Sequence, residues 1–182
     1  VILPRKTVLE LQRLLSDADA PEGQQAPMIE MQFASNQAKF IFGGMEFVTK
    51  LVEGKFPDYN RVIPRNHRNN VTLGRAPLLA SLQRTAILTS DKFKGARLNF
   101  EPGSLRIATS NTEQEEATDE LDINYEGDSI EIGFNISYLI DALSNMSQEE
   151  MIDIALQDAS SSALITLPGN EHFKYVVMPM RI

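Results

Sequence analysis

The sequence predicts an α+β fold in which a helix followed by three antiparallel strands recurs along the chain. Apolar residues at helical spacing appear in three stretches, about 60 residues apart. Each stretch is followed by runs of alternating or β-branched residues, with turn-forming residues between them. A helix with one apolar stripe and a sheet with one apolar face must cover each other. Two such units side by side therefore predict two helices against two four-stranded sheets per complete domain.

The first unit begins near the start of the chain. Residues 3–15 carry Val8, Leu11, Leu14 and Leu15 at helical spacing, and Pro4 suits a first helical turn. A polar loop is expected over 16–27. Strands are expected at 28–33, 39–42 and 46–52. The chain opens on Val1 with this unit unpaired, which suggests a fragment.

The second and third units form a complete pair. The second has a short strand at 71–73, a helix that starts at Pro77, and strands at 96–100, 105–108 and 120–125. The third has a strand at 129–134, a helix capped by Asn135 or Ser137, and strands at 151–156, 162–167 and 173–178. We therefore divide the chain into residues 1–68, half a domain plus a linker, and residues 69–182, a complete domain.

Composition narrows the class of protein. The 182 residues carry a net charge of −8, 42% hydrophobic residues and no cysteine. Without cysteine there is no disulfide scaffold or thiolate nucleophile, which fits a reducing cytoplasm. The sequence contains no run of about 18 apolar residues, so no membrane span is expected. The acidic balance argues against wrapping nucleic acid with the whole surface, although it allows local basic patches.

The C-terminal stretch Tyr175–Ile182 has an unusual pattern. Tyr-Val-Val is typical of a strand, and Pro179 cannot donate to a sheet ladder, so pairing should stop there. The methionines on either side of Pro179 are flexible and suit a surface that accepts several apolar partners. Two interpretations remain open: a final core strand, or one wall of an apolar docking groove with Arg181 at its rim.

Enzymatic interpretations are weak. Asp158, Ser160–Ser162 and His172 contain the residue types of a hydrolase triad, but the serines lie between two hairpin strands without a nucleophile elbow. His67 and His172 are the only histidines, which excludes a histidine-rich metal site. We expect a non-catalytic protein with no cofactor and no metal.

Several strings match one known family in the right order. They are Val1–Lys6, Lys50–Tyr59 followed by Arg61-Val62, Ile87-Leu88, Lys92-Phe93, Glu113–Glu116 and the terminal Tyr175–Arg181. On these residues, the chain resembles the C-terminal half of the bacterial sliding clamps, the beta subunits of DNA polymerase III. The similarity runs nearly end to end and covers the second part of the family's middle domain and all of its third domain.

The resemblance implies a DNA clamp fold and a processivity factor. Family members form a head-to-tail homodimer ring around duplex DNA, with helices lining the hole. By resemblance, Arg5 and Lys6 face the DNA, with Arg13 and Arg84 as weaker candidates. Contacts to phosphate would make binding sequence-independent. The location would be cytoplasmic and nucleoid-associated.

The resemblance also implies a peptide-binding pocket shared by the replicative polymerase, the clamp loader and repair proteins. The matching positions are Pro57, Arg61, Val62, Ser160, Ser162, Val176, Met178, Pro179, Met180, Arg181 and Ile182. Two of them depart from the family pattern: Ser160 stands where an apolar residue is expected, and Ile182 replaces the more usual leucine. Both departures bear on the shape of the pocket and on its affinity for peptides.

By the same resemblance, Ile87 and Leu88 correspond to the ring-closing contact, and Glu113, Glu115 and Glu116 could pair basic residues of a facing subunit. Ile87 and Leu88 are neighbours on a helix, so both cannot point inward and one should be exposed. Without its first domain, the fragment should not close a ring by itself. A second functional class, a β-rich peptide-binding adaptor unrelated to DNA, would use the same C-terminal groove.

Overall fold

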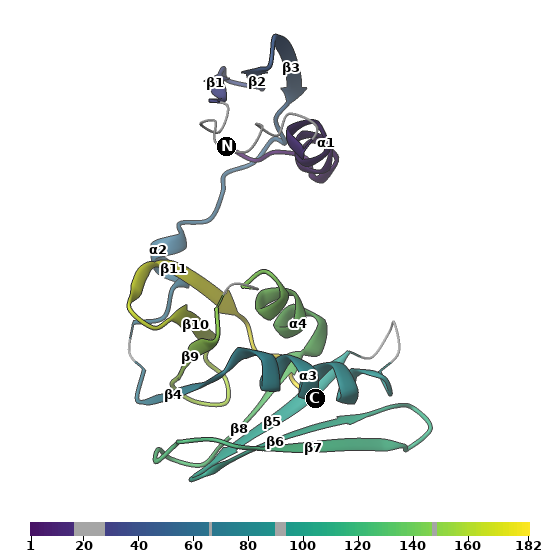
Figure 1. Cartoon of the computed structure of the whole chain (residues 1–182), viewed down its shortest axis with the longest axis vertical. Coiled ribbons are helices and arrows are strands. Elements are labelled where there is room, and N and C mark those ends of the chain that lie inside the picture. The colour runs from purple at the N-terminus through teal and green to yellow at the C-terminus, as the bar shows by residue number, and fades with distance from the viewer. Residues whose placement is uncertain (17–27, 66, 90–93, 147–148) are drawn as a thin grey trace. The chain divides into compact units, whose positions relative to one another are not determined.

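The computed structural model describes residues 1–16, 28–65, 67–89, 94–146 and 149–182, apart from the side chains of Ser16 and Glu171. Most of the loop expected at 16–27 and the Lys92-Phe93 string therefore lie outside the described residues. The chain forms two compact units, Val1–Asp58 and Tyr59–Ile182 (Figure 1). Each unit has its own hydrophobic core.

The first unit is one helix and one three-stranded sheet. Its elements are α1 (Arg5–Ser16), β1 (Glu30–Phe33), β2 (Gln37–Phe42) and β3 (Met45–Lys50), with sheet order β1-β2-β3. Alternation along β2 buries Ala38, Phe40 and Phe42 on one face, where they pack with partly buried leucines of α1. This bears out the helix and the three strands expected for the first unit.

The apolar stripe of α1 is rotated slightly from its expected position. Val8 is 49% exposed, whereas its neighbour Thr7 is buried. The Thr7 and Thr49 hydroxyls share a hydrogen bond of 2.7 Å, which ties the helix to β3. Because Thr7 lies on the same helical face as Leu11 and Leu14, this polar contact orients the helix and leaves Val8 outside the core.

The second unit contains two four-stranded sheets and two main helices, as the sequence predicts. Its elements are α2 (Tyr59–Val62), β4 (Asn69–Gly74), α3 (Arg75–Ala86), β5 (Gly95–Glu101), β6 (Ser104–Ser110), β7 (Glu116–Asp122), β8 (Ile130–Asn135), α4 (Ile136–Ser144), β9 (Met151–Leu156), β10 (Ala163–Leu167) and β11 (Asn170–Val177). The sheet orders are β11-β10-β9-β4 and β7-β6-β5-β8, antiparallel throughout.

The two repeats within this unit exchange a strand. β4 immediately precedes α3 but pairs with β9, in the sheet that follows α4. In the same way, β8 precedes α4 but pairs with β5, in the sheet that follows α3. Neither repeat can therefore complete its sheet without the other, and the two repeats share a single core.

The helices α3 and α4 contact each other and pack between sheets (Figure 1). α3 buries Leu78 and Leu82, and α4 buries Leu139 and Leu143. Arg75, the first residue of α3, donates hydrogen bonds to the Leu143 and Glu149 carbonyl oxygens, close to the C-terminal end of α4. A cation there satisfies carbonyl groups that have no partner within the helix.

The helix starts resolve two details of the sequence interpretation. α3 begins at Arg75, two residues before the expected Pro77; proline is accommodated because the first helical N–H groups have no intrahelical partner. α4 is capped by Asn135, whose side-chain oxygen accepts a 3.0 Å hydrogen bond from the Ser137 N–H. Asn135, rather than Ser137, is therefore the N-cap residue.

Strand β7 differs most from expectation. It runs from Glu116 to Asp122, whereas the sequence predicts a strand at 120–125. The first residues of β7 are mostly polar, so the sequence pattern did not indicate a strand there. Polar residues are tolerated because β7 is at the edge of its sheet. Asp119 lies on its half-buried face, where an apolar residue is usual.

Candidate functional site

The last strand, β11, has two different faces. Tyr175 and Val177 pack against the core, and Val176 and Lys174 alternate with them. Val176 lies directly opposite Leu164 of β10. The outer surface of this strand pair forms a cavity of about 820 Å³ with α2 and the segment that follows it. The cavity is lined by Tyr59, Asn60, Val62, Ile63, Pro64, Arg65, His67, Leu164, His172, Lys174 and Val176.

The cavity combines an apolar wall with nitrogen-bearing groups. Val62, Leu164 and Val176 supply apolar surface, and Arg65, His67, His172 and Lys174 supply cations or imidazoles. Burial lowers the pKa of His67, which favours the neutral ring. Its Nε2 atom is buried and has no hydrogen-bond partner among the described residues. The cavity can therefore take an apolar group and offers polar groups beside it.

The tail after β11 leaves its own sheet. Strand pairing stops at Val177, which agrees with the expectation that Pro179 ends it. The Met180 N–H then donates a 2.8 Å hydrogen bond to the Gly133 carbonyl oxygen in β8. Ile182 lies against Gly95 and Gly133 and lines a second cavity of about 270 Å³ on the outer face of the β5–β6–β8 region. Residues 175–177 form a core strand, and the residues beyond them cross to the other sheet.

The structure brings together part of the expected pocket. Val62 and Val176 line the larger cavity, and Arg61 precedes Val62 on exposed α2. Ile182 lines the smaller cavity, and Met178 and Met180, 65% and 40% exposed, line neither of these two. The remaining positions are described by location: Pro57 is exposed in the first unit, Ser160 and Ser162 lie between β9 and β10, and Pro179 and Arg181 lie in the tail.

The serines near Asp158 form a turn. Asp158 accepts hydrogen bonds from the backbone N–H and hydroxyl groups of both Ser160 and Ser161. These bonds lower the pKa of Asp158, with the Ser160 hydroxyl as the largest cause. The carboxylate therefore shapes the β9–β10 loop, and the two hydroxyl groups are oriented toward it rather than toward a histidine.

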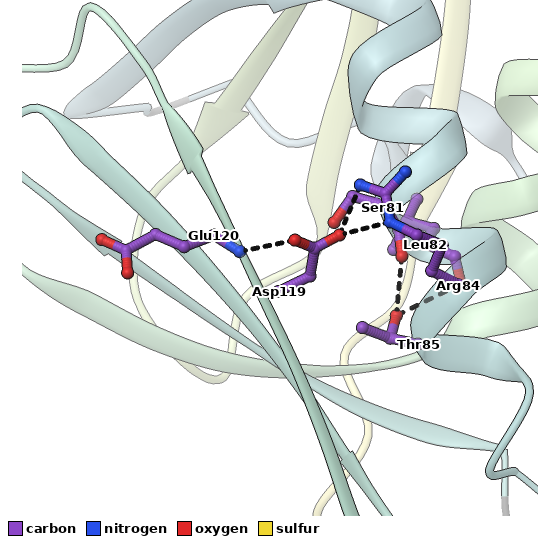
Figure 2. A network of polar contacts seen from close by, with 6 residues as sticks. All are labelled: Ser81, Leu82, Arg84, Thr85, Asp119 and Glu120. Carbon is purple, nitrogen blue, oxygen red and sulfur yellow. Dashed lines mark hydrogen bonds and ion pairs between the residues drawn. The ribbon is translucent and has the colours of Figure 1, made fainter.

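The C-terminal end of α3 presents an exposed apolar residue. Ile87 is 80% exposed and Leu88 is half-buried, so one of the two points outward, as the sequence predicts. Figure 2 shows the contacts just before this pair. The Thr85 hydroxyl donates to the carbonyl oxygens of Ser81 and Leu82 one turn earlier. Thr109 of β6 donates a 2.7 Å hydrogen bond to the Thr85 carbonyl oxygen, which holds the end of α3 on the sheet.

The same helix end is tied to β7 by an ion pair. Arg84 Nε and Nη2 donate hydrogen bonds of 2.9 Å and 2.5 Å to Asp119 Oδ2. Figure 2 draws this contact between α3 and β7. The Arg84 guanidinium is the main cause that lowers the pKa of Asp119, so the carboxylate stays ionised. This explains the acidic residue on the inner face of β7. It also means that Arg84 is paired with a carboxylate of its own unit.

The other expected charged residues are on the surface. Arg5 and Lys6 are exposed in the first turn of α1, and Arg13 pairs with Glu10 at 2.6 Å. The acidic run lies in the β6–β7 connection. There the Asn111 side chain accepts hydrogen bonds from the Glu113 and Glu115 N–H groups and donates to the Glu115 carboxylate. Glu113 and Glu115 in this connection are exposed, and so is Glu116, the first residue of β7.

Several residues of the larger cavity were missed from sequence. Lys174 and His172 lie two and four residues before Val176, so strand alternation places them on the same face. Leu164 could be recognised only from the β10–β11 register. Ile63 and His67 lie outside helices and strands, and no periodicity indicated where their side chains point.

Together, these elements define a protein built from repeated helix-and-sheet units, with a cavity beside its last strand. Comparisons identify its family. The chain matches the family models "DNA polymerase III beta subunit, central domain" over residues 1–58 and "DNA polymerase III beta subunit, C-terminal domain" over residues 60–181. The chain belongs to the DNA polymerase III beta subunit family.

Curated relatives support this membership. The chain is 46% identical to a beta sliding clamp of Pseudomonas putida and 41% identical to one of Escherichia coli, each over all 182 residues. These alignments cover 47% and 48% of the relatives, so the chain spans about half their length. Membership confirms the resemblance found in the sequence and agrees with a non-catalytic subunit.

Solved structures agree in fold. The crystal structure of the DNA polymerase III subunit beta from Pseudomonas aeruginosa matches with a TM-score of 0.89 at 42% identity, covering 100% of this chain and 48% of that one. A DNA polymerase sliding clamp from Caulobacter crescentus matches with a TM-score of 0.88 at 31% identity, covering 100% and 46%. These matches bear out the expected clamp fold. In the described part of the chain, no helix is long and apolar enough to cross a membrane.

Proposed function

We propose that the chain is part of a sliding clamp that encircles duplex DNA, acts as a processivity factor for the replicative polymerase, and docks short peptides of the polymerase, the clamp loader and repair proteins. Family membership over the whole chain carries this proposal. The relatives named as sliding clamps are about twice as long, so a ring would require about as much chain again in each subunit. Residues 1–68 would then be the second part of a middle domain with its linker, and residues 69–182 a complete domain.

A topological test addresses the clamp role. The full-length protein would be loaded by a clamp loader onto nicked circular DNA, and the circle would then be cut. A ring that encircles the duplex loses its DNA after linearisation, because it slides off the free ends. Retention on linear DNA equal to that on the circle would contradict encirclement. We expect such a protein in the cytoplasm, associated with the nucleoid.

For contact with DNA, we propose Arg5 and Lys6. Both are exposed in the first turn of α1, which contains no acidic residue. Cations at a helix N-terminus are disfavoured by the helix dipole, so helix stability does not explain them. Arg84 and Arg13 are weaker candidates because each pairs with a carboxylate of its own unit. Replacing Arg5 and Lys6 by glutamine should reduce both DNA affinity and its salt dependence.

For peptide docking, we propose the cavity between α2 and β11, together with the tail that follows β11. The apolar surface of Val62, Leu164 and Val176 supports this assignment. Burying apolar side chains of a peptide contributes about 25 cal/mol per Å². A few kcal/mol is gained in this way and is partly offset by the ordering of the peptide, which suits weak and exchangeable binding.

A deletion tests the role of the tail. Removing Met180–Ile182 should abolish binding of a partner peptide and leave the fold intact, since the three residues are exposed and outside the core. Titration of a fluorescent peptide measures binding, and circular dichroism measures folding. Met151→Ala, which truncates an exposed methionine of β9, is the control. An unchanged titration with the folded deletion variant would reject the role of the tail.

For ring closure, we propose the end of α3 and the β6–β7 loop. Ile87 is a large apolar side chain that is 80% exposed, and Leu88 follows it. The exposed Glu113, Glu115 and Glu116 could pair basic residues of a facing subunit. A head-to-tail contact needs two different surfaces, and these residues would form one of them. We therefore expect the 182-residue chain alone not to close a ring.

A further inference from the structure

The buried polar residues of the chain are concentrated at the end of α3. Ser81, Thr85 and Thr109 are three of the five buried polar residues in the described part of the chain. Ser81 and Thr85 lie on the last two turns of α3, and Thr109 reaches this end from β6. Polar groups are costly to bury, and an apolar contact would hold a helix on a sheet equally well. Their concentration here therefore indicates a requirement other than the burial of apolar surface.

The Thr109 hydroxyl satisfies a backbone group that the helix leaves open. The last carbonyl oxygens of a helix have no intrahelical partner. That of Ala86 accepts a hydrogen bond from the N–H group of Thr89, which follows shortly in the chain. The Thr85 carbonyl oxygen accepts instead from Thr109, a residue 24 positions away, at 2.7 Å. This bond therefore sets where the end of α3 lies on the sheet.

A second polar contact is made by the same turn of the helix. Arg84 of α3 donates two hydrogen bonds to Asp119 of β7, the strand next to β6. Figure 2 draws this pair together with the Thr85 side chain. Hydrogen bonds are directional. Because one contact is made by a backbone carbonyl group and the other by a side chain, together they restrict both the position and the rotation of the helix end.

The residue whose direction these contacts determine is Ile87. It directly follows α3 with helical backbone angles, φ −58° and ψ −35°, and it is 80% exposed. Since its backbone continues the helix, the direction of its side chain follows the rotation of α3. The fold gains little from holding an exposed side chain in one direction. A partner that must meet this side chain gains directly, because less ordering is needed on association.

We propose that Thr109 and the Arg84–Asp119 pair are positioning residues for ring closure, which hold Ile87 in the direction in which it meets a facing subunit. The inference rests on the proposed ring contact at Ile87 and adds the device that sets this contact in advance. Thr109 is 3% exposed, so it cannot touch a facing subunit. Its effect on association must therefore pass through α3.

Thr109→Val in the full-length protein tests the proposal. Valine has nearly the shape of threonine but lacks the hydroxyl group that reaches the Thr85 carbonyl oxygen. We expect the dissociation constant of the dimer, measured by sedimentation velocity, to rise roughly three- to tenfold. Thr109→Ser retains a hydroxyl group and should keep most of the affinity. In the 182-residue chain, Thr109→Val should also shift the methyl NMR signals of Ile87, which reports its reorientation without a partner.

Thr7→Val is the matched control. Thr7 is also buried, and its hydroxyl shares a hydrogen bond of the same length, 2.7 Å, with Thr49 in the first unit. This variant should lose stability in thermal unfolding, as Thr109→Val does, and leave the dissociation of the dimer unchanged. Equal weakening of the dimer by both variants would assign the effect to a general loss of stability and reject the positioning role.

A double-mutant cycle tests the ion pair. Arg84→Met, Asp119→Asn and the double variant would be compared in the same dissociation measurement. If the two residues position Ile87 as a pair, the double variant should weaken the dimer about as much as either single variant. Effects that multiply would mean that each residue contacts the facing subunit separately, and would reject the pair as a positioning device.

Further outcomes separate this inference from the ring contact itself. A dimer that is unchanged in folded Thr109→Val but dissociates in Ile87→Lys would reject the positioning role and keep the contact. A dimer that is unchanged in Ile87→Lys would reject the contact, and the inference with it. Should Thr109→Val fail to fold, the cycle decides, and a double variant that dimerises like the unmodified protein would overturn the inference.

Discussion

The backbone N–H of Met180 donates a hydrogen bond to the carbonyl oxygen of Gly133, with 2.8 Å between the two atoms. This bond joins the tail after β11 to β8 of the other four-stranded sheet. A Cβ atom at position 133 would lie 2.5 Å from the Met180 carbonyl oxygen and 2.8 Å from Ile182 Cδ1. Because both distances are shorter than a van der Waals contact, the tail can lie here only when residue 133 has no side chain.

Gly133→Ala should therefore displace the tail. The added methyl group meets backbone as well as side chain, so a rotamer change alone cannot relieve the contact. The last residues are exposed and outside the core, so they should move in preference to β8. We expect altered methyl NMR signals of Met180 and weaker binding of a partner peptide. The free energy of unfolding should change by less than about 1 kcal/mol.

Gly95→Ala is the graded control for this change. The three atoms nearest to a Cβ there are side-chain atoms of Ile182, at 3.2–3.5 Å, a contact that the end of a flexible side chain can relieve. Its effect on the Met180 signals should be smaller than that of Gly133→Ala. Identical spectra for Gly133→Ala and the unmodified chain would show that the tail does not rest on Gly133.

Asn135→Ala should destabilise the second unit by about 1 kcal/mol. The Asn135 side chain accepts the hydrogen bond from the Ser137 N–H that caps α4, and alanine cannot replace it. Urea unfolding followed by circular dichroism measures the loss. Ser137→Ala is the matched control, because its backbone N–H is retained and only its hydroxyl is removed. If Ser137→Ala costs as much as Asn135→Ala, the cap assignment is wrong.

Much of this fold follows from local patterns. The sequence predicted a strand at 39–42, and the structure has β2 there, with Ala38, Phe40 and Phe42 buried on one face. The turn residues before Ser104 located the hairpin of β5 and β6, and apolar residues at helical spacing before Leu143 located α4. Each of these elements was predicted to within a few residues of its observed bounds. The strings that indicated the family lie within these elements and their connections.

Other features depend on contacts between distant segments. Nothing local in β4 or β8 indicates that each pairs with the sheet of the other repeat. β7 was placed four residues too late because Asp119 stands on its inner face, and only the Arg84 side chain from α3 explains an acid there. The role of His67 in the cavity likewise depends on how the segment after α2 folds over β10 and β11.

The Arg84–Asp119 pair should make stability depend on pH in the acidic range. Arg84 lowers the pKa of Asp119 from its ordinary value of 3.8, so the folded state favours the ionised form. The contribution is therefore fully present above pH 3.8 and is lost as pH falls through the lower folded pKa. Because both side chains are partly exposed, we expect only about 0.2–1 kcal/mol.

A comparison of Asp119→Asn with the unmodified chain isolates this contribution. Urea unfolding would be measured from neutral pH to well below 3.8. The stability difference between the two proteins should be constant at higher pH and shrink toward acidic pH. Asp122→Asn, an exposed carboxylate on the same strand, is the control. A difference that stays constant at all pH values would contradict the effect of Arg84 on Asp119.

Ile87→Lys should separate association from folding. Ile87 is 80% exposed, so its replacement should change the free energy of unfolding by no more than about 0.5 kcal/mol. If Ile87 is a central apolar contact of a ring, lysine would place a charge in that interface, and the dimer of the full-length protein should dissociate at least about tenfold more readily. Sedimentation velocity over a range of concentrations measures this dissociation.

Tyr138→Lys is the control, because Tyr138 is also a large exposed side chain but lies on α4; this variant should leave the dimer intact. An unchanged dimer in Ile87→Lys would remove the end of α3 from the proposed contact. The hydrogen bond from Thr109 to the Thr85 carbonyl and the Arg84–Asp119 pair would then serve only to fix α3 on its sheet.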